Sequence, residues 1–354
     1  MRILCVSTQR NEGPFLLEWI AHLRACGITD LLVYSNDCDD GSDALLDLLQ
    51  DQGVLTHIKQ DVPEGESVQW TALRAAWKHP LRKEVDWALC CDVDEFPVIK
   101  VGEGRFSDLL NTVLEEFDAM VLPWRLFGAN GVNRFVDAPV TEQFRGAQRP
   151  DARWPVAATF FKTIFRVNGP FNQFGVHRPK QKAEAKAGLP VIVDGAGRRL
   201  PEAFVRNVKR LSLFGTPMGR NLAEINHYSL RSAESFLIKR DRGLPNRTEK
   251  AIDLAYWVER NFNETTESDV DRVAGQRAAE LERLKSLAGV SEAHDTAVAW
   301  HKERFQNLIT TEEGHRLFSQ LLLASGSTTP SPESARQMVD WFQTAYRRSL
   351  DLSS

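Results

Sequence analysis

The stretch Trp87-Ala88-Leu89-Cys90-Cys91-Asp92-Val93-Asp94-Glu95-Phe96 passes from an unbroken apolar run to three carboxylates within four positions. A short apolar run without polar alternation is typical of a strand buried on both faces. Asp92 and Asp94 would then lie where this strand leaves the sheet, at the edge where open α/β sheets bind ligands. Two such carboxylates suit Mg2+ or Mn2+, above all when a diphosphate supplies further oxygen ligands. The alternative is that both residues only close a turn, because Asp is common in turns.

The chain around this stretch alternates between apolar runs and helical patterns. The predicted strands cover residues 3–7, 31–34, 54–58, 87–91 and 119–124. The predicted helices between them cover residues 15–26, 43–50, 67–79 and 107–117. This rhythm predicts an α/β fold with a mostly parallel, Rossmann-like sheet and helices on both faces. The first strand is followed by no G-x-G-x-x-G, and no G-x-x-x-x-G-K-[ST] occurs, so neither common phosphate-binding loop is present.

The second half of the chain has a different character. Residues 133–227 are irregular and carry aromatic, Arg, Gly and Pro clusters, which indicates substrate loops. From residue 232 onward helical periodicity dominates. The predicted helices cover residues 232–242, 249–260, 268–287, 291–308, 311–324 and 332–348. We therefore divide the chain into an α/β domain, residues 1–230, and a helical C-terminal region, residues 231–354.

The composition excludes several classes of protein. Hydrophobic residues make up 42% and charged residues 26%, as in an ordinary globular protein. A formal net charge of -4 argues against nucleic-acid binding, which usually requires a strongly basic surface. The five cysteines are odd in number, have no CxxC spacing, and indicate reduced thiols. Because no signal peptide or apolar run of about eighteen residues is found, we expect a cytoplasmic protein that can also contact the inner face of a membrane.

Several separate stretches resemble one family. The chain is similar to glycosyltransferases of the GT-A fold, in the family 2-like and family 92-like group, over roughly residues 1–243. The matching segments are Arg10-Asn11-Glu12-Gly13-Pro14-Phe15-Leu16-Leu17-Glu18-Trp19, Asn36-Asp37-Cys38-Asp39-Asp40-Gly41-Ser42, Asp92-Val93-Asp94-Glu95-Phe96, Phe127-Gly128-Ala129-Asn130-Gly131, His177-Arg178-Pro179 and Asn226-His227-Tyr228-Ser229-Leu230-Arg231-Ser232. A D-x-D triplet alone is weak, whereas six ordered segments are specific.

The resemblance implies a role for each matching residue. Asp92 would contact the ribose or the metal, and Asp94 would ligate Mn2+ or Mg2+ bridging the diphosphate. His227 would complete the metal or diphosphate contacts. The residues implied to hold the nucleotide are Thr8, Arg10 and Glu12 after the first strand and Asp39 and Asp40 after the second. Their structural alternatives are a helix N-terminus that favours Glu12 and a turn or N-cap formed by Asp39 and Asp40.

The implied reaction also needs cations and a base. A divalent metal would stabilise the charge on the departing nucleoside diphosphate, and Lys162, Arg166 or Arg178 would add hydrogen bonds to phosphate. The acceptor hydroxyl needs a carboxylate base opposite the leaving group. The candidates for the base are Glu95, Glu142 and Asp137. Glu95 has two further interpretations, as support for Asp94 or as the start of a turn.

These residues predict a metal-dependent, inverting glycosyltransferase. We expect a nucleotide-sugar donor, with a UDP-sugar favoured, and an acceptor that is a saccharide, a glycolipid or a precursor of a cell-surface polysaccharide. Trp124 and Trp154 are the candidates for stacking on the acceptor. The alternatives are a nucleotidyltransferase and a non-catalytic nucleotide- or sugar-binding module of a polysaccharide assembly complex.

Overall fold

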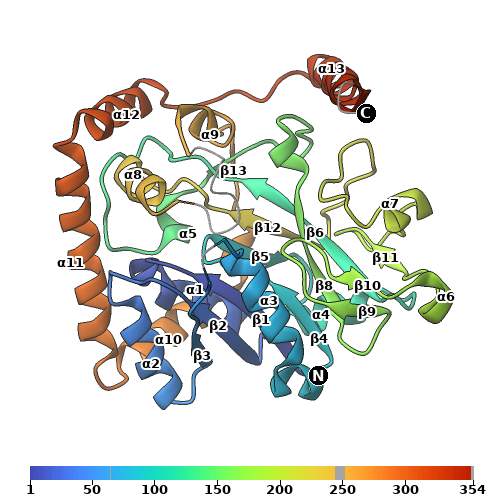
Figure 1. The fold of residues 1–354 in the computed structure, drawn as a ribbon, viewed down its shortest axis with the longest axis horizontal. Helices are drawn as coiled ribbons and strands as arrows, with labels where there is room; N and C mark the ends of the chain where they lie inside the picture. Colours follow the sequence, from blue (N-terminus) through green and yellow to red (C-terminus); the bar gives the residue numbers. More distant parts are fainter. Residues whose placement is uncertain (64, 244–251, 352–354) are drawn as a thin grey trace.

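The computed structural model describes residues 1–63, 65–243 and 252–351, with side chains described as far as residue 345. Its centre is a mixed sheet with the strand order β3-β2-β1-β4-β8-β6-β12-β5, and β11 pairs with β6 (Figure 1). The strands of this sheet are β1 (Ile3–Gln9), β2 (Asp30–Ser35), β3 (Thr56–Lys59), β4 (Trp87–Cys90), β5 (Glu95–Ile99), β6 (Ala119–Leu126), β8 (Phe161–Arg166), β11 (Ile192–Val193) and β12 (Ala223–His227).

The predicted α/β class and mostly parallel sheet are confirmed, with two local corrections. β1 pairs in parallel with β2 and β4, and β6 pairs in parallel with β12. β8 is antiparallel to β4 and β6, and β5 is antiparallel to β12. The sequence did not reveal β5, β8 or β12. They begin within or directly after segments rich in charge or irregular turns, where a clear period-2 pattern is lost.

The helices cover both faces of this sheet. They are α1 (Gly13–Ala25), α2 (Ser42–Asp51), α3 (Val68–Lys78), α4 (Phe106–Thr112), α5 (Val140–Gln143), α6 (Glu184–Ala187) and α7 (Glu202–Arg206). The chain continues with α8 (Ala233–Arg242), α9 (Leu254–Val258), α10 (Ala274–Lys285), α11 (Val290–Ile309), α12 (Glu312–Leu323) and α13 (Pro332–Asp351). Shorter elements are the 3-10 helices η1 (Pro80–Glu84), η2 (Val156–Thr159) and η3 (Asp269–Val273), and the paired strands β9 (Phe171–Gln173) with β10 (Lys180–Gln181) and β7 (Gly146–Ala147) with β13 (Thr265–Thr266).

Two predicted helices are shorter than expected. α4 ends at Thr112 rather than at 117, and Leu114, inside the predicted range, is 97% exposed. α9 begins only at Leu254 because the carboxylate of Asp253 accepts a hydrogen bond from the backbone N–H of Tyr256. The first part of the predicted helix, residues 249–251, lies outside the described residues.

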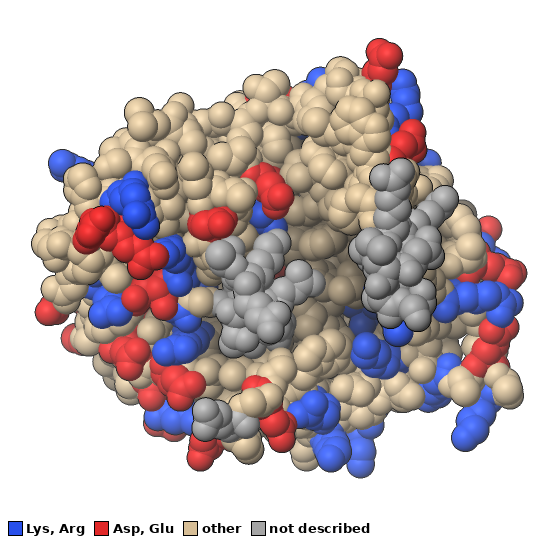
Figure 2. Space-filling view, turned by 45° about the horizontal axis from the view of Figure 1, so that its top comes forward, with Lys and Arg blue, Asp and Glu red and all other residues tan. Residues whose placement is uncertain are grey.

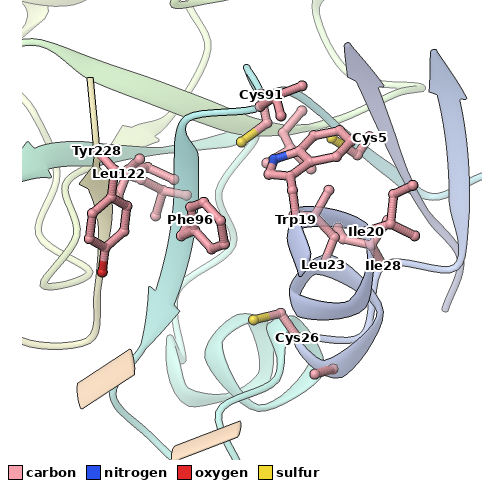
Figure 3. Packing of buried hydrophobic residues seen from close by; sticks show 14 of the residues in the cluster. Cys5, Trp19, Ile20, Leu23, Cys26, Ile28, Cys91, Phe96, Leu122 and Tyr228 are labelled. Atoms are coloured by element: carbon pink, nitrogen blue, oxygen red, sulfur yellow. The ribbon is translucent and has the colours of Figure 1, made fainter. Parts of the chain in front are cut away.

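The buried strands have no polar face because both of their faces are covered. In β1, Ile3 and Cys5 pack in the core that contains α1, whereas Leu4 and Val6 pack with α3. Successive side chains of a strand point to opposite faces, so an unbroken apolar run buries both. Figure 3 shows the α1 side of this core, where Trp19 lies beside Cys5 and Cys91, with Phe96 of β5 nearby.

The C-terminal helices pack directly against the α/β part. α10 lies along α1, and α11 contacts α1, α2 and α8 (Figure 1). Val273, Leu284 and Val290 are buried in the same core as Trp19. The predicted boundary at residue 230 is therefore no break in packing. Within the described residues, no helix combines the length and the apolar character that crossing a membrane requires.

Candidate functional site at the ends of the strands

The acidic stretch lies between two strands, and strand register brings a histidine to it. Asp92 follows β4, and Asp94 directly precedes β5. β12 pairs with β5 so that His227 lies opposite Glu95, and the backbone N–H of Tyr228 donates to the carbonyl of Asp94. His227 Nε2 therefore lies 3.5 Å from Asp94 Oδ1. The family resemblance implied that Asp94 and His227 serve one site, and the structure places the two side chains next to each other.

The second neighbour of Asp94 is a lysine from α8. Lys239 Nζ lies 2.7 Å from Asp94 Oδ2 and 2.9 Å from the carbonyl oxygen of Ser229. Burial alone would raise the pKa of the Asp94 carboxyl, but Lys239 and His227 hold this pKa well below its usual range. Burial lowers the pKa of His227, although Asp94 opposes this effect. Asp94 is thus a carboxylate that is almost enclosed by cationic and imidazole groups.

Asp92 is held by a different lysine. Lys162 Nζ, on β8, lies 2.8 Å from Asp92 Oδ2 and 3.1 Å from Glu95 Oε2. The side chain of Asp92 is 32% exposed, whereas Lys162 and Glu95 are fully buried. Burial lowers the pKa of Lys162, but the two carboxylates outweigh burial and raise it well above its usual value. The structure thus brings the predicted residue Lys162 to the acidic stretch.

Glu95 is not a turn residue, because it begins β5. Its Oε2 accepts the backbone N–H of Asp92 at 2.8 Å, and burial raises the pKa of its carboxyl, against the opposing charge of Lys162. A fully buried side chain of this kind orients Asp92 and cannot meet an acceptor hydroxyl. The structure corrects the predicted roles of Glu95 as base and as turn residue. Its carboxylate supports Asp92 rather than Asp94, the residue that it was expected to support.

The other two candidates for the base lie on the surface. Asp137 is exposed and lies 3.1 Å from His294 Nε2, which lowers its pKa. Glu142 is exposed on α5. The pairing of Asp137 with His294 leaves Glu142 as the candidate with an open carboxylate.

Glu12 binds arginines of its own chain rather than lining an open pocket. Its oxygens contact Arg231 Nη1 at 2.6 Å and Arg242 Nη1. Burial would raise the pKa of Glu12, but the two guanidinium groups lower it to about 2. The predicted nucleotide contact of Glu12 is therefore corrected: its two oxygens are used to join the loop after β1 to α8.

The two aspartates after β2 differ in their surroundings. Asp40 is buried, and its carboxylate accepts the backbone N–H groups of Gly13 and Ser42 at 2.8 and 2.9 Å. This arrangement favours the turn interpretation for Asp40. Asp39 is exposed and contacts Asn11 Nδ2 at 3.4 Å, and Arg10 Nε donates to the carbonyl of Asp37. Asp39 and Arg10 thus keep polar groups at the surface beside the strand ends.

Buried polar atoms without a hydrogen-bond partner gather at these strand ends. Within the described residues they include Thr8 Oγ1, Tyr34 Oη and Gln69 Oε1. Thr8 and Tyr34 are register neighbours on β1 and β2, and the amide nitrogen of Gln69, on α3, donates to Asp92 Oδ1 at 3.1 Å. Because most buried polar groups in proteins are hydrogen-bonded, this group of open acceptors and donors points to a ligand.

A second group lies around His227. The rings of Trp124 and His227 are 4.1 Å apart, and those of Trp124 and His177 are 5.3 Å apart. Trp124 Nε1 and His227 Nδ1 are buried without a hydrogen-bond partner among the described residues. The ring of Trp154 instead contacts the rings of Phe214 and Phe342.

Two of the predicted phosphate-binding arginines have other partners. Arg178 is buried and donates to the backbone carbonyls of Phe204, Val205 and Asn207; burial lowers its pKa to about 10. Arg166 pairs with Trp87 at the start of β4, the end of the strand opposite to Asp92. The structure therefore does not bring Arg166 to Asp92, and Arg178 is engaged by the protein backbone.

Sequence reasoning missed Gln69 and Lys239. Lys239 is separated from Asp94 by 145 residues, and no local spacing reports such a contact. The only signal was a predicted helix rich in basic residues directly after the segment that contains His227.

A metal ion needs several donor side chains that converge on one point. Among the described residues, no three His, Cys, Asp or Glu side chains come together as a metal-binding cluster. Asp94 and His227 are nevertheless adjacent and offer an oxygen and a nitrogen, which suits a cation whose other ligands are diphosphate oxygens. The residues thus fit a metal shared with a bound nucleotide. The face of the molecule that carries α8 and α9 is hollowed near its middle in Figure 2.

The chain is an α/β protein whose strand ends bring together carboxylates, lysines and a histidine. A family model described as Glycosyltransferase family 92 matches residues 2–194. This match covers more than half of the 354 residues, and the chain belongs to glycosyltransferase family 92. The matched part contains Asp92, Asp94 and Lys162, whereas His227 and Lys239 lie beyond it.

Individual relatives are more distant. The chain is 33% identical over 97 residues to a glycosyltransferase family 92 protein of Arabidopsis thaliana, and the alignment covers 26% of this chain and 16% of the relative. The chain therefore spans only a small part of that relative's length. A structure of residues 1–349 of TarS from S. aureus has a TM-score of 0.34 at 12% identity, covering 92% of this chain and 89% of TarS 1–349. A longer TarS structure has a TM-score of 0.31 at 14% identity, covering 47% and 28%.

Proposed function

We propose that this protein is a glycosyltransferase that moves a sugar from a nucleotide-sugar donor to an acceptor hydroxyl. The observation that carries the proposal is the convergence of Asp94, His227 and Lys239 at the ends of the strands, next to Asp92 and Lys162. Family membership supports the reaction class, and the unpaired buried polar atoms support a polar ligand at this edge.

The nucleoside of the donor, a UDP-sugar in our proposal, binds between α3 and the ends of β1 and β2. Thr8 Oγ1, Tyr34 Oη and Gln69 Oε1 offer hydrogen bonds there to a ribose and a pyrimidine. Gln69 already contacts Asp92, so one amide can join the nucleoside to the acidic stretch. Arg10 and Asp39 lie at the exposed border of the same strand ends.

The diphosphate of the donor binds beside Asp94. We propose that Asp94 and His227 hold Mn2+ or Mg2+ together with diphosphate oxygens. When bound, such a cation stabilises the charge on the departing nucleoside diphosphate. Lys162 and Glu95 keep Asp92 fixed, since the Asp92 carboxylate contacts Lys162 and its N–H contacts Glu95. In this proposal the Asp92 carboxylate is held in place by the protein, and the Asp94 carboxylate shares the cation with the diphosphate.

The acceptor approaches from the side of Trp124 and His177. We propose a saccharide or glycolipid acceptor and an inverting displacement, in which a carboxylate takes the proton of the attacking hydroxyl. Glu142 is the candidate whose exposed carboxylate pairs with no histidine among the residues that the structure describes. Trp124 Nε1 offers a hydrogen bond for a sugar hydroxyl.

The test is release of nucleoside diphosphate from a panel of nucleotide sugars, with Mn2+ and with EDTA, for the wild type and Asp94→Asn. We expect turnover of a UDP-sugar that needs Mn2+ and falls at least a hundredfold in Asp94→Asn, a typical loss when transition-state charge is left unstabilised. Asp151→Asn, which removes only a surface partner of Arg149, is the matched control and should keep full activity. Failure of every nucleotide sugar to react would reject the enzyme, and binding without turnover would favour a binding module.

A further inference from the structure

Each carboxylate at these strand ends, and Glu12 beside them, already contacts a cation of the protein that is buried or at most 13% exposed. The carboxylate–cation pairs are Asp92 with Lys162, Glu95 with Lys162, Asp94 with Lys239 and Glu12 with Arg231 and Arg242. A site of this kind differs from a cluster of bare carboxylates, because its negative charge is already neutralised. A divalent cation therefore meets little net attraction here until another anion arrives.

Lys239 stands out among these cations by its position. Its ammonium occupies Oδ2 of Asp94, the carboxylate whose Oδ1 faces His227. The side chains of Asp94 and Lys239 are 11% and 12% exposed, so neither is free to turn into bulk water. A metal bound by Asp94 and His227 would lie within a few ångströms of the Lys239 ammonium, and two cations at that distance repel strongly.

The ammonium of Lys239 also has hydrogen-bonding capacity to spare. It carries three N–H donors, of which Asp94 Oδ2 and the Ser229 carbonyl accept two. If Lys239 moves from Asp94, the Ser229 carbonyl still anchors it, and two donors become available for phosphate oxygens. Lys239 can thus exchange one anionic partner for another without leaving the site.

We propose that Lys239 competes with the divalent cation for Asp94 and, once displaced, binds the diphosphate of the donor. This inference rests on the proposed function. It makes metal and nucleotide binding interdependent: the cation alone must displace Lys239 without compensation, whereas the nucleotide gives the displaced ammonium a new anion. A metal–nucleotide pair therefore binds far better than the two separate affinities predict.

The experiment measures this coupling directly. Mn2+ binding to the 354-residue chain is followed by the electron paramagnetic resonance signal of free Mn2+, with and without saturating UDP. For the wild type we expect weak binding of Mn2+ alone and a gain of roughly thirtyfold or more with UDP, within the range of ordinary coupling free energies. Lys239→Met should bind Mn2+ alone about tenfold more tightly, and its gain with UDP should fall by about tenfold.

Three further variants control the result. Asp94→Asn should abolish Mn2+ binding and so locate the measured site. Arg240→Met removes a cation of the same helix that pairs with the exposed Glu313, and it should behave as the wild type. If Lys239→Met does not fold, as judged by circular dichroism, Lys239→Gln keeps a donor for the Ser229 carbonyl without the charge and should show the same two changes.

The outcomes separate the two proposals. An unchanged Mn2+ affinity and an unchanged gain with UDP in the folded Lys239 variants would overturn the inference. If no variant binds Mn2+ while UDP still binds, the inference fails and a nucleotide-sugar enzyme remains supported. If neither UDP nor any other nucleotide of the panel binds, the proposed function fails as well.

Discussion

Glu12 and Arg231 are separated by 219 residues in the sequence, and their carboxylate and guanidinium groups lie 2.6 Å apart in a buried ion pair. Arg231 has a φ of 57°, in the left-handed region that L side chains other than Asn, Asp and His seldom adopt. Its guanidinium also donates to the carbonyl of Val93 and lies 3.5 Å from the centre of the Phe15 ring. One strained arginine thus joins α1, the acidic stretch and the segment before α8.

The first prediction concerns the stability that this arginine provides. Arg231→Met leaves the buried Glu12 with Arg242 as its remaining partner, and we expect the free energy of unfolding to fall by about 3 kcal/mol. The measurement is urea-induced unfolding followed by fluorescence. Arg283→Met breaks an i,i+3 pair at the surface, in which the side chains of Arg283 and Glu280 are 49% and 20% exposed, and it should lower the free energy of unfolding by no more than about 0.5 kcal/mol. Equal losses in the two variants would show that the buried pair contributes no more to the free energy of unfolding than the surface pair does.

The second prediction is the effect of acid on the same carboxylate. The pKa of Glu12 is lowered from 4.5 to about 2, so its ionised form stabilises the folded state above pH 4.5. That contribution, on the order of 3 kcal/mol, is lost as the pH falls from 4.5 toward 2. Glu12→Gln should therefore be less stable at pH 7 and lose less stability than the wild type between pH 5 and pH 3. Parallel curves of unfolding free energy against pH would contradict this.

The sequence predicted the alternation of strands and helices and the position of the acidic stretch, because both follow from the spacing of apolar and polar residues over short segments. An apolar run such as Trp87–Cys90 predicts a strand with both faces buried, whichever helices cover those faces. The meeting of Asp94 with His227 was predicted from resemblance, and the register of β5 with β12 places the two together.

What the sequence did not predict depends on contacts between distant residues. Glu12 was expected to contact the nucleotide. Instead, Arg231 and Arg242, which are more than 200 residues away in the sequence, bind its two carboxylate oxygens. Glu95 resembled a base, but strand pairing buries it beside Lys162. The role of such a carboxylate depends on which cation the fold places beside it. The spacing of apolar residues along the sequence carries no information about that partner.

The third prediction tests the unpaired hydroxyl of Tyr34. Because this buried hydroxyl has no hydrogen-bond partner among the described residues, Tyr34→Phe should leave the free energy of unfolding unchanged or slightly higher. If the nucleotide forms a hydrogen bond with this hydroxyl, Tyr34→Phe should weaken UDP binding roughly tenfold, which corresponds to about 1.4 kcal/mol. Calorimetric titration with UDP measures the affinity, and thermal unfolding measures the stability. An unchanged affinity would place the nucleoside elsewhere.

The fourth prediction concerns the joint between the loop after β1 and the C-terminal helices. A Cβ added at Gly13 would lie 2.4 Å from the Cβ of Ala297 on α11 and 3.0 Å from Asp40 Oδ2. Gly13→Ala should therefore cost about 1–3 kcal/mol of unfolding free energy, as other overpacked sites do. Gly275→Ala, in an exposed first turn of α10 with no atom near the added methyl, should instead be neutral or stabilise by up to about 1 kcal/mol.

The double variant Gly13→Ala with Ala297→Gly decides whether the contact with α11 causes the loss. Removing the methyl of Ala297 takes away the 2.4 Å clash but leaves the neighbouring Asp40. Residues in direct contact are not additive, so the double variant should recover more than half of the stability lost in Gly13→Ala, after correction for the cost of Ala297→Gly alone. Additive losses would mean that the cost of Gly13→Ala comes from the backbone of residue 13 or from a clash with Asp40. The close approach of Gly13 to Ala297 would then not be what sets the packing of α11 against the start of α1.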